Sequence, residues 1–565
     1  MAKVNGGRLV IEGLKQEGLK YLFTLSGNQI EPILDAVIDS GIKLIDVRHE
    51  QAAVHMADAM ARLTGEPSAV TVTAGPGIAN TIPGMAVAYH SASPVLLVTG
   101  QASFAEADTS QLQETPQVSL MEPVTKWAGT CRQTGRIPEY ISIAFRHACS
   151  GRKGPVFLEI PNDIMDADVE EEKVTYPIKY RTDSRPQGQK EQIDEAVDIL
   201  LNAERPVVLA GGGVWWSRAS MELIKFIESF NIPLILSSGM ARGLVPEDHP
   251  LYVGSVKVVG APRVITREAD VVLSLGARLN GWKSRGRPPV FRMDQKWIQV
   301  DIDPLEIGRN RPVEVGILGD IQMVLKQMIG VLNSKGKERS DQSWVKKCQE
   351  VAAARWETAQ QVPQSTSGLI HPLHLCKGIR EYLNKDAVIV VDGGDIAEFA
   401  VDSLRSYHPG HWLDASGLGM IGAGIPFGIG SKLAKPDKQV LVLTGDGSFG
   451  FNCMEFDTAI RHNIPVVVVV ANDAAWGMVK HAQEGIRGFD RVIGSELRLT
   501  RYDKVVEALG GHGAYVEKPE ELAPALEKAF ASGLPACINV KVDPTIASPL
   551  TASVVKWRLS TKSST

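Results

Sequence analysis

The chain has 565 residues and a formal net charge of −5, and 44% of its residues are hydrophobic and 22% charged. This length predicts three or four domains, and the composition is that of a globular protein. The small negative charge gives no reason to expect nucleic acid or a membrane as a partner, and no uncharged apolar run is long enough to span a bilayer. The six cysteines lack metal-ligand spacing and the first residues lack the apolar core of a signal peptide, so we expect reduced thiols and a cytoplasmic location.

The first predicted unit, residues 1–165, alternates strand and helix patterns. An apolar strand ends just before Glu50, and a helix rich in alanine follows it. A second strand, over residues 69–72, leads into a Gly-Pro-Gly turn at 75–77. Taken alone, Glu50 is as well explained by the favourable placement of an acid at a helix N-terminus.

A second unit is predicted over residues 191–335, after an acidic and proline-containing linker over 166–190. It holds an apolar strand that leads into three consecutive glycines, at 211–213. Such turns bind nucleotides in Rossmann-like folds, but a single glycine triplet does not establish a nucleotide site. The stretch 335–365 is charged and is expected to be loop or partly helical.

The third unit, residues 366–548, carries the most informative motif of the chain. A strand ends in Gly-Asp-Gly around Asp446, and a short helix and a second strand then lead to Asn472-Asp473. In a parallel sheet both carboxylates reach the same carboxyl edge, where ligands of such sheets bind. Two oxygen donors beside a glycine turn suit a Mg²⁺ ion that carries a diphosphate. A Gly-Asp-Gly run by itself is most often an ordinary turn.

The three units together predict an α/β protein with three doubly wound domains. A polar tail follows over residues 549–565, and at a chain end such a composition more often means solvated disorder than a folded segment.

The glycine motif at Asp446 and the Arg-His-Glu run that ends at Glu50 resemble the thiamine diphosphate (ThDP) enzymes of the acetolactate synthase, benzaldehyde lyase and 2-hydroxyacyl-CoA lyase superfamily. In that family a glutamate at the position of Glu50 contacts N1′ of the cofactor's aminopyrimidine. The resemblance implies that Asp446, Asp473 and the backbone carbonyl of Ala475 hold Mg²⁺. The family carries a second asparagine where this chain has Asp473, and an aspartate keeps the oxygen ligand while adding negative charge.

The resemblance also implies further contacts with ThDP. Gly419 would accept a hydrogen bond from the 4′-amino group, and Ile421, where many relatives have methionine, would support the bent shape of the cofactor. The other cofactor-binding residues that it implies, besides Glu50 and Asp473, are Gly394, Asp395, Gly447, Ser448 and Trp476.

The family likeness implies an architecture and an assembly as well. Residues 1–165 would bind the pyrimidine, 191–335 would form the central domain, and 366–548 would bind the diphosphate and the metal. Glu50 of one subunit would meet the diphosphate site of its neighbour, so a homodimer or homotetramer is expected. The central domain of relatives holds FAD, ADP or nothing, and the sequence leaves that choice open.

The implied reaction is the making or breaking of a carbon–carbon bond in a small-molecule substrate. Asn28, Gln29 and Gln113 occupy loops that face the reacting part of the cofactor in relatives, and are candidate catalytic residues. The run 278–282 is similar to oxalyl-CoA decarboxylases and 2-hydroxyacyl-CoA lyases. Our first prediction is therefore cleavage of a 2-hydroxyacyl-CoA to an aldehyde and formyl-CoA, or the reverse condensation.

The alternative is acetolactate synthase-type or benzaldehyde lyase-type carboligation of 2-oxo acids or aldehydes, because the loop 113–116 resembles that of acetolactate synthases. Two other classes fit less well. The presence of Glu50 argues against a non-catalytic regulator. The glycine turn at 211–213 lacks the full pattern of an NAD-dependent dehydrogenase.

Overall fold

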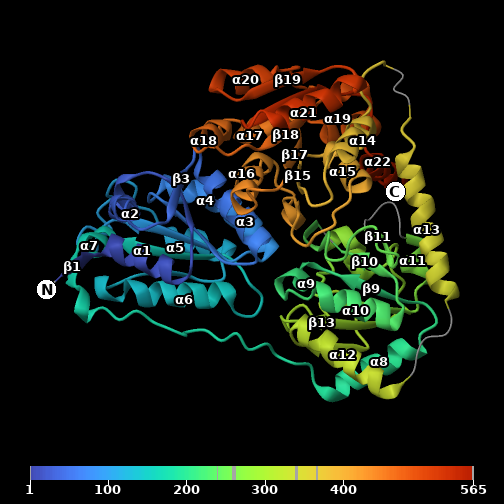
Figure 1. Ribbon diagram of the computed structural model, residues 1–565, viewed down its shortest axis with the longest axis horizontal. Helices are drawn as coiled ribbons and strands as arrows, with labels where there is room; N and C mark the ends of the chain where they lie inside the picture. Colours follow the sequence, from blue (N-terminus) through green and yellow to red (C-terminus); the bar gives the residue numbers. More distant parts are fainter. Residues whose placement is uncertain (1, 238, 257–262, 337–341, 364–366, 563–565) are drawn as a thin grey trace.

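The computed structural model describes residues 2–237, 239–256, 263–336, 342–363 and 367–562, which form three α/β units (Figure 1). Each unit is built on a six-stranded sheet, and all strand pairs within the three sheets are parallel. In Figure 1 the first unit is blue to cyan, the central unit is green, and the third unit is orange to red. The predicted α/β class with three domains is confirmed.

The first unit has the strand order β3-β2-β4-β5-β7-β6. Its strands are β2 (Tyr21–Leu25), β3 (Lys43–Asp46), β4 (Ser68–Val72), β5 (Val95–Gln101), β6 (Ala128–Thr130) and β7 (Val156–Pro161). Its main helices are α1 (Gly6–Gln16), α2 (Glu31–Val37), α3 (Glu50–Thr64), α4 (Pro76–Ser91), α5 (Gln117–Met121) and α6 (Ile137–Cys149). The chain runs from β2 to β3 on one side and then crosses to β4 on the other, so a topological switch point lies between β2 and β4.

The third unit repeats this topology, with the strand order β16-β15-β17-β18-β20-β19. Its strands are β15 (Val388–Asp392), β16 (Trp412–Leu413), β17 (Val440–Gly445), β18 (Val467–Asn472), β19 (His512–Val516) and β20 (Ala536–Lys541). Its main helices are α14 (Pro372–Tyr382), α15 (Asp395–Ser403), α16 (Gly424–Ala434), α17 (Asp446–Asn452), α18 (Glu455–Arg461), α19 (Gly477–Arg487), α20 (Tyr502–Leu509) and α21 (Leu522–Ala531). The switch point here lies between β15 and β17.

The central unit differs, because its strand order is β11-β10-β9-β12-β13-β14. This is the order of dinucleotide-binding folds, in which the switch point lies between the first and fourth strands, here β9 and β12. The strands are β9 (Pro206–Ala210), β10 (Leu234–Leu236), β11 (Tyr252–Ser255), β12 (Val271–Leu275), β13 (Lys296–Asp301) and β14 (Val315–Leu318). The main helices are α8 (Lys190–Asn202), α9 (Gly212–Trp216), α10 (Ser220–Phe230), α11 (Arg263–Glu268) and α12 (Ile321–Lys335).

The middle strands are buried because helices cover both faces of each sheet. All six residues of β18 are buried, as the run of four valines at its start favours. The first and third units share one hydrophobic core through α3 and α16. These helices approach so closely that a Cβ added at Gly430 would lie 2.5 Å from the carbonyl oxygen of Met56.

The ends of the units differ in detail from the predicted boundaries. Strand β1 (Lys3–Asn5) pairs antiparallel with β8 (Asp168–Glu170), which ties the start of the predicted linker to the first unit. Between the second and third units, α13 (Ser343–Gln360) is a helix of 18 residues. The tail, whose polar composition is more typical of disorder, forms helix α22 (Pro549–Lys562) because α19 offers it a packing surface. Residues 563–565 lie outside the described part.

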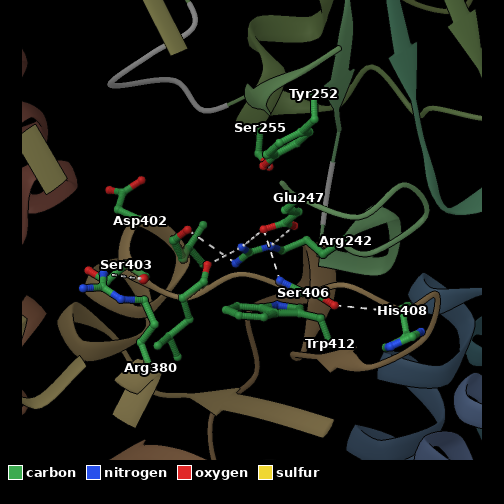
Figure 2. Close-up of polar contacts among 12 residues, drawn as sticks. Arg242, Glu247, Tyr252, Ser255, Arg380, Asp402, Ser403, Ser406, His408 and Trp412 are labelled. Atoms are coloured by element: carbon green, nitrogen blue, oxygen red, sulfur yellow. Dashed lines mark hydrogen bonds and ion pairs between the residues drawn. The ribbon is translucent and has the colours of Figure 1, made fainter. Parts of the chain in front are cut away.

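A buried ion pair joins the central and third units (Figure 2). Nε and Nη2 of Arg242 donate to the two carboxylate oxygens of Glu247 at 2.8 and 2.5 Å, and Nη2 also donates to the carbonyl of Leu404 at 2.6 Å. The guanidinium lies over the ring of Trp412, 3.7 Å from its centroid. The backbone N–H of Ser406 donates to Glu247. Arg242 and Glu247 therefore each have hydrogen-bond partners in both units, and we call this contact the joint.

Within the described ranges, the helices include none whose length and apolar character would let it cross a bilayer. The six cysteines are free thiols in this structure.

Candidate active site

The carboxyl edge of the third sheet carries a cavity of about 180 Å³ beside the switch point between β15 and β17. Its wall comes from residues 372–546 alone. Nine of the residues predicted to hold the metal or the cofactor line it: Gly394, Asp395, Ile421, Asp446, Gly447, Ser448, Asp473, Ala475 and Trp476. Loops that are far apart in the sequence therefore meet where parallel sheets bind ligands.

The carboxylates of Asp446 and Asp473 face each other in this cavity. Asp446 is almost fully buried, and its Oδ2 has no hydrogen-bond partner within the part of the chain that the structure describes. Burial, followed by the charge of Asp473, raises the pKa of Asp446 far above its usual range, and burial raises the pKa of Asp473 as well. Two buried carboxylates of this kind need a cation to be stable in the ionised form.

The donor set suits a hard divalent cation. No third histidine, cysteine or acidic residue joins the pair among the described residues, so further oxygen ligands would come from the backbone, water or a phosphate. Asp473 Oδ1 accepts a hydrogen bond from the N–H of Ala475 at 3.1 Å, and this contact shapes the loop that presents the Ala475 carbonyl. The residues present thus fit Mg²⁺ bound together with a diphosphate.

Glycines open this edge to phosphate oxygens. Gly393 has a φ of +107°, a conformation that favours glycine, and Gly394 precedes the nine-residue helix α15, whose N-terminus favours an anion. At Gly447 a Cβ would lie 2.5 Å from the Trp476 ring, so only glycine lets Trp476 close this side of the cavity.

The glycine-rich segment 416–424 is held by a residue whose role the sequence did not reveal. The buried carboxylate of Asp392 accepts hydrogen bonds from the N–H groups of Gly422 and Gly424, at 2.9 and 2.8 Å. Burial raises the pKa of Asp392 to about 6. Ile421 lines the cavity, whereas Gly419, with a φ of +69°, is exposed next to it and is not part of the cavity wall.

The predicted residues of the first unit gather at the switch point between β2 and β4. The hydroxyl of Thr73 donates to the side-chain oxygen of Gln29 and lies 3.3 Å from that of Gln113. Glu50, which is 7% exposed, accepts a hydrogen bond from the Asn80 side chain at 3.0 Å. Asn28 is exposed on a 3₁₀ turn, and the structure does not bring it into this polar cluster.

A buried network that we did not predict holds the Gly-Pro-Gly turn of this cluster. The side-chain oxygen of Gln117 accepts from the N–H of Gly75 at 2.9 Å, and its nitrogen donates to Glu159 at 3.0 Å. Thr130 also donates to Glu159, at 2.6 Å. Gln117 directly follows the loop 113–116. Its place beside this motif is the only sequence feature that could have marked it as part of the site.

In a single chain the two clusters do not line one common cavity. Glu50 begins helix α3, which packs against α16, and the N–H groups of Arg48 and His49 donate to Glu455 of the third unit at 3.0 Å each. None of Glu50, Gln29 or Gln113 is among the residues that line the cavity at Asp446. Within one chain the two half-sites are therefore separate.

The central sheet carries a larger cavity, of about 810 Å³, at its own switch point. Gly212 and Gly213 after β9 and Gly276 after β12 form one wall. Several cations face the space, namely Arg152, Lys153, Arg278, Lys283 and Arg309. Burial, followed by the charge of Arg278, lowers the pKa of Lys283 to about 8.

An acid at the end of β13 completes this cavity. Asp301 is buried, and burial raises its pKa to about 6. Glycine turns at such a switch point let a nucleotide phosphate approach the backbone. The side chain of Trp282, in the run 278–282, lies outside the described part.

Comparison with known proteins agrees with this arrangement. Residues 4–120 match the thiamine pyrophosphate enzyme N-terminal TPP binding domain, 193–328 match the central domain, and 392–540 match the C-terminal TPP binding domain. The matched ranges contain the three sheets or most of their strands.

Relatives cover almost the whole chain. The acetolactate synthase large subunit IlvG of Mycobacterium tuberculosis is 37% identical over 97% of this chain and 97% of its own length. The 2-hydroxyacyl-CoA lyase 2 of Bos taurus is 31% identical over 92% of this chain and 86% of its own, and the 2-hydroxyacyl-CoA lyase 1 of Homo sapiens is 29% identical over 96% and 95%. The chain therefore belongs to the thiamine diphosphate-dependent enzymes, in the group that includes acetolactate synthases and 2-hydroxyacyl-CoA lyases.

Proposed function

We propose that the chain is a ThDP- and Mg²⁺-dependent carboligase of the acetolactate synthase type that joins 2-oxo acids. The higher identity to acetolactate synthases, 37% against 29–31% for the two lyases, supports this choice. It reverses the order of our two sequence-based interpretations. The cofactor assignment rests on the buried carboxylates of Asp446 and Asp473, which need a cation when ionised and lie beside a glycine turn at the sheet edge.

The proposed roles follow the two half-sites. Asp446, Asp473 and the Ala475 carbonyl would hold Mg²⁺. When bound, ThDP supplies a nucleophilic carbon that adds to carbonyl groups and a ring that takes up negative charge. The diphosphate would lie against Gly394, Gly447 and Ser448, with Trp476 at its side and Gly419 and Ile421 towards the aminopyrimidine.

In the first unit Glu50 would hold a proton at N1′ of the aminopyrimidine. Gln29 and Gln113, which both face Thr73, would orient the substrate oxygen by hydrogen bonds. Asn28 is exposed in one chain and would reach the substrate only from a subunit boundary.

A homodimer is the smallest complete unit in this proposal, and a homotetramer is a pair of such dimers. The support is the separation of the two half-sites within one chain, because Glu50 is not among the residues that line the cavity at Asp446. A second copy with two-fold symmetry can bring Glu50 of one subunit to the diphosphate site of the other.

Cleavage of a 2-hydroxyacyl-CoA remains the second candidate. It is favoured by the run 278–282 and by the similarity to the two lyases. The cations of the large central cavity suit an adenosine diphosphate group, which is common to ADP, FAD and CoA, and we propose a nucleotide of this class there.

The free cysteines support a reducing, cytoplasmic compartment.

The assay that separates the candidates is turnover by the full chain with ThDP and Mg²⁺. Pyruvate, a 2-hydroxyacyl-CoA and benzoin are supplied in parallel, and acetolactate, formyl-CoA and benzaldehyde are measured. Acetolactate as the main product supports the proposal. Formyl-CoA without acetolactate would replace it with the lyase, and benzaldehyde from benzoin alone would point to the benzaldehyde lyase type.

A further inference from the structure

The side chain of Asp395 is engaged by the C-terminal segment of the chain. Asp395 is the first residue of α15 and lines the cofactor cavity. Its Oδ1 accepts from the N–H of Ser548 at 3.2 Å and from the hydroxyl of Thr551 at 2.5 Å, while its Oδ2 lies 2.7 Å from Nδ1 of His481. Both oxygens are thus held by protein groups on α19 and at the start of α22.

His481 makes two contacts that only its charged form can satisfy together. Nδ1 faces the carboxylate of Asp395, and Nε2 lies 2.9 Å from the carbonyl oxygen of Pro544. A neutral imidazole has a single N–H, so two acceptors require the imidazolium. Burial lowers the pKa of His481, but the hydrogen bonds to Asp395 and Pro544 and the charges of Asp395 and Asp473 outweigh burial and raise it.

The first turn of α22 is fixed at this point. Ser548 and Thr551 are buried, their hydroxyls lie 3.1 Å apart, and the N–H of Thr551 donates to the Ser548 hydroxyl at 3.2 Å. Further along, Val555 packs on Gly485 of α19, where an added Cβ would lie 2.6 Å from its Cγ1. The terminal helix therefore rests on α19 and on Asp395.

We propose that Asp395 and His481 are positioning residues that couple the terminal helix to the diphosphate turn, so that cofactor binding and docking of α22 strengthen each other. This inference rests on the proposed cofactor site. The side chain of Asp395 does not serve as a ligand of the cofactor; it orients the turn at Gly394 and anchors α22. Because such coupling is reciprocal, a loosely docked α22 weakens the binding of the cofactor, and removal of the cofactor weakens the docking of α22.

The test uses calorimetric titration of the full chain with ThDP in excess Mg²⁺, together with amide hydrogen exchange of residues 549–562. His481→Gln removes one of the two hydrogen bonds, and Thr551→Val removes a hydroxyl while keeping the shape. Each is expected to weaken ThDP binding about tenfold, the scale of one hydrogen bond to a charged group. Matched controls are His374→Gln on α14 and Thr358→Val on α13, which should bind as the original chain does.

In the original chain ThDP should slow exchange in α22, and in the two variants this slowing should be lost while exchange in α10 is unchanged. Unchanged ThDP affinity in both variants, or weaker binding with the slowing of α22 intact, would overturn the coupling. Failure of the unmodified chain to bind ThDP would instead overturn the proposed function. If His481→Gln fails to fold, Thr551→Val decides, because unchanged ThDP affinity in that variant contradicts the coupling.

Discussion

At the scale of single residues, the buried carboxylates of Asp446 and Asp473 determine how the third unit responds to pH and metal. Burial and mutual repulsion raise the pKa of Asp446 above its unfolded value, so the folded, metal-free protein binds more protons than the unfolded chain. Stability from this group is therefore present at low pH and falls as pH rises through the folded pKa. A divalent cation between the carboxylates removes this loss.

We predict that Mg²⁺ with ThDP raises the thermal midpoint more at pH 8 than at pH 5.5, measured by scanning fluorimetry against a sample with a chelator. Asp446→Asn removes the ionisable group, so the metal-free variant should lose less stability between these two pH values than the original chain. It should also gain nothing from Mg²⁺. An equal Mg²⁺ effect at both pH values would show that the pair does not hold the metal.

At the scale of elements, the contact between α3 and α16 joins the first and third units. Gly430 lets the two helices approach, because a Cβ there would lie 2.5 Å from a backbone oxygen of Met56. In the same contact the rings of His55 and Phe427 pack edge to face, with their centroids 5.3 Å apart. Burial lowers the pKa of His55 to about 3, so its ring is neutral. Glu50 is the first residue of α3, so this packing fixes where its side chain lies.

We predict that Gly430→Ala destabilises the chain by about 1–3 kcal/mol through overpacking, although alanine favours a helix. Gly330→Ala on α12 is the matched control, because nothing lies within 4 Å of a Cβ there. The control should stabilise by about 0.5–1 kcal/mol. Thermal unfolding of both variants tests these two predictions. A stabilising effect of Gly430→Ala would contradict the close approach of α3 and α16.

At the scale of the whole molecule, the joint at Arg242 and Glu247 holds the central unit to the third. Glu247→Gln leaves the arginine charge buried without its partner, which costs about 3–5 kcal/mol. We expect a large fall in the thermal midpoint. Lys190→Gln, which breaks the exposed pair with Asp194, should change stability by about 1 kcal/mol or less. Similar effects of the two substitutions would mean that the buried pair is not structural.

The proposed assembly makes its own prediction at this scale. Glu50→Gln and Asp446→Asn should each abolish turnover, because the first removes a proton-holding group worth about 10²–10⁴-fold and the second removes a ligand of the proposed metal. Unfolding and refolding an equal mixture should restore about a quarter of the original activity, because half of the randomly paired dimers carry one intact site of two. No recovery in mixed dimers, checked by tagged purification, would place both residues in sites within one chain.

Much of this architecture was accessible from residues alone. Short-range patterns decided it: apolar runs of strand length, glycine turns at their ends, and acids after the turns. The edge of the third sheet gathers Asp446, Asp473 and Gly394 because parallel strands present their carboxyl ends together, a rule that needs no coordinates. The class, the three units and the cluster of loop residues followed from it.

Contacts between distant segments were not accessible in this way. No sequence pattern relates the partners of three buried hydrogen bonds, which run from Gly422 to Asp392, from Gln117 to Glu159 and from Thr551 of α22 to Asp395. The polar composition of the tail argued for disorder, but a helix forms because α19 and Asp395 supply partners for it.

The amino-acid sequence by itself determined the fold class and the chemistry that this protein can hold, because the strand periods and the acids and glycines that follow them are local properties. Only the tertiary structure decided which acids lack a partner, which are neutralised, and that the two halves of the site are separate within one chain. The physical reason is that burial and charge pairing depend on neighbours that the folded chain brings from hundreds of residues away.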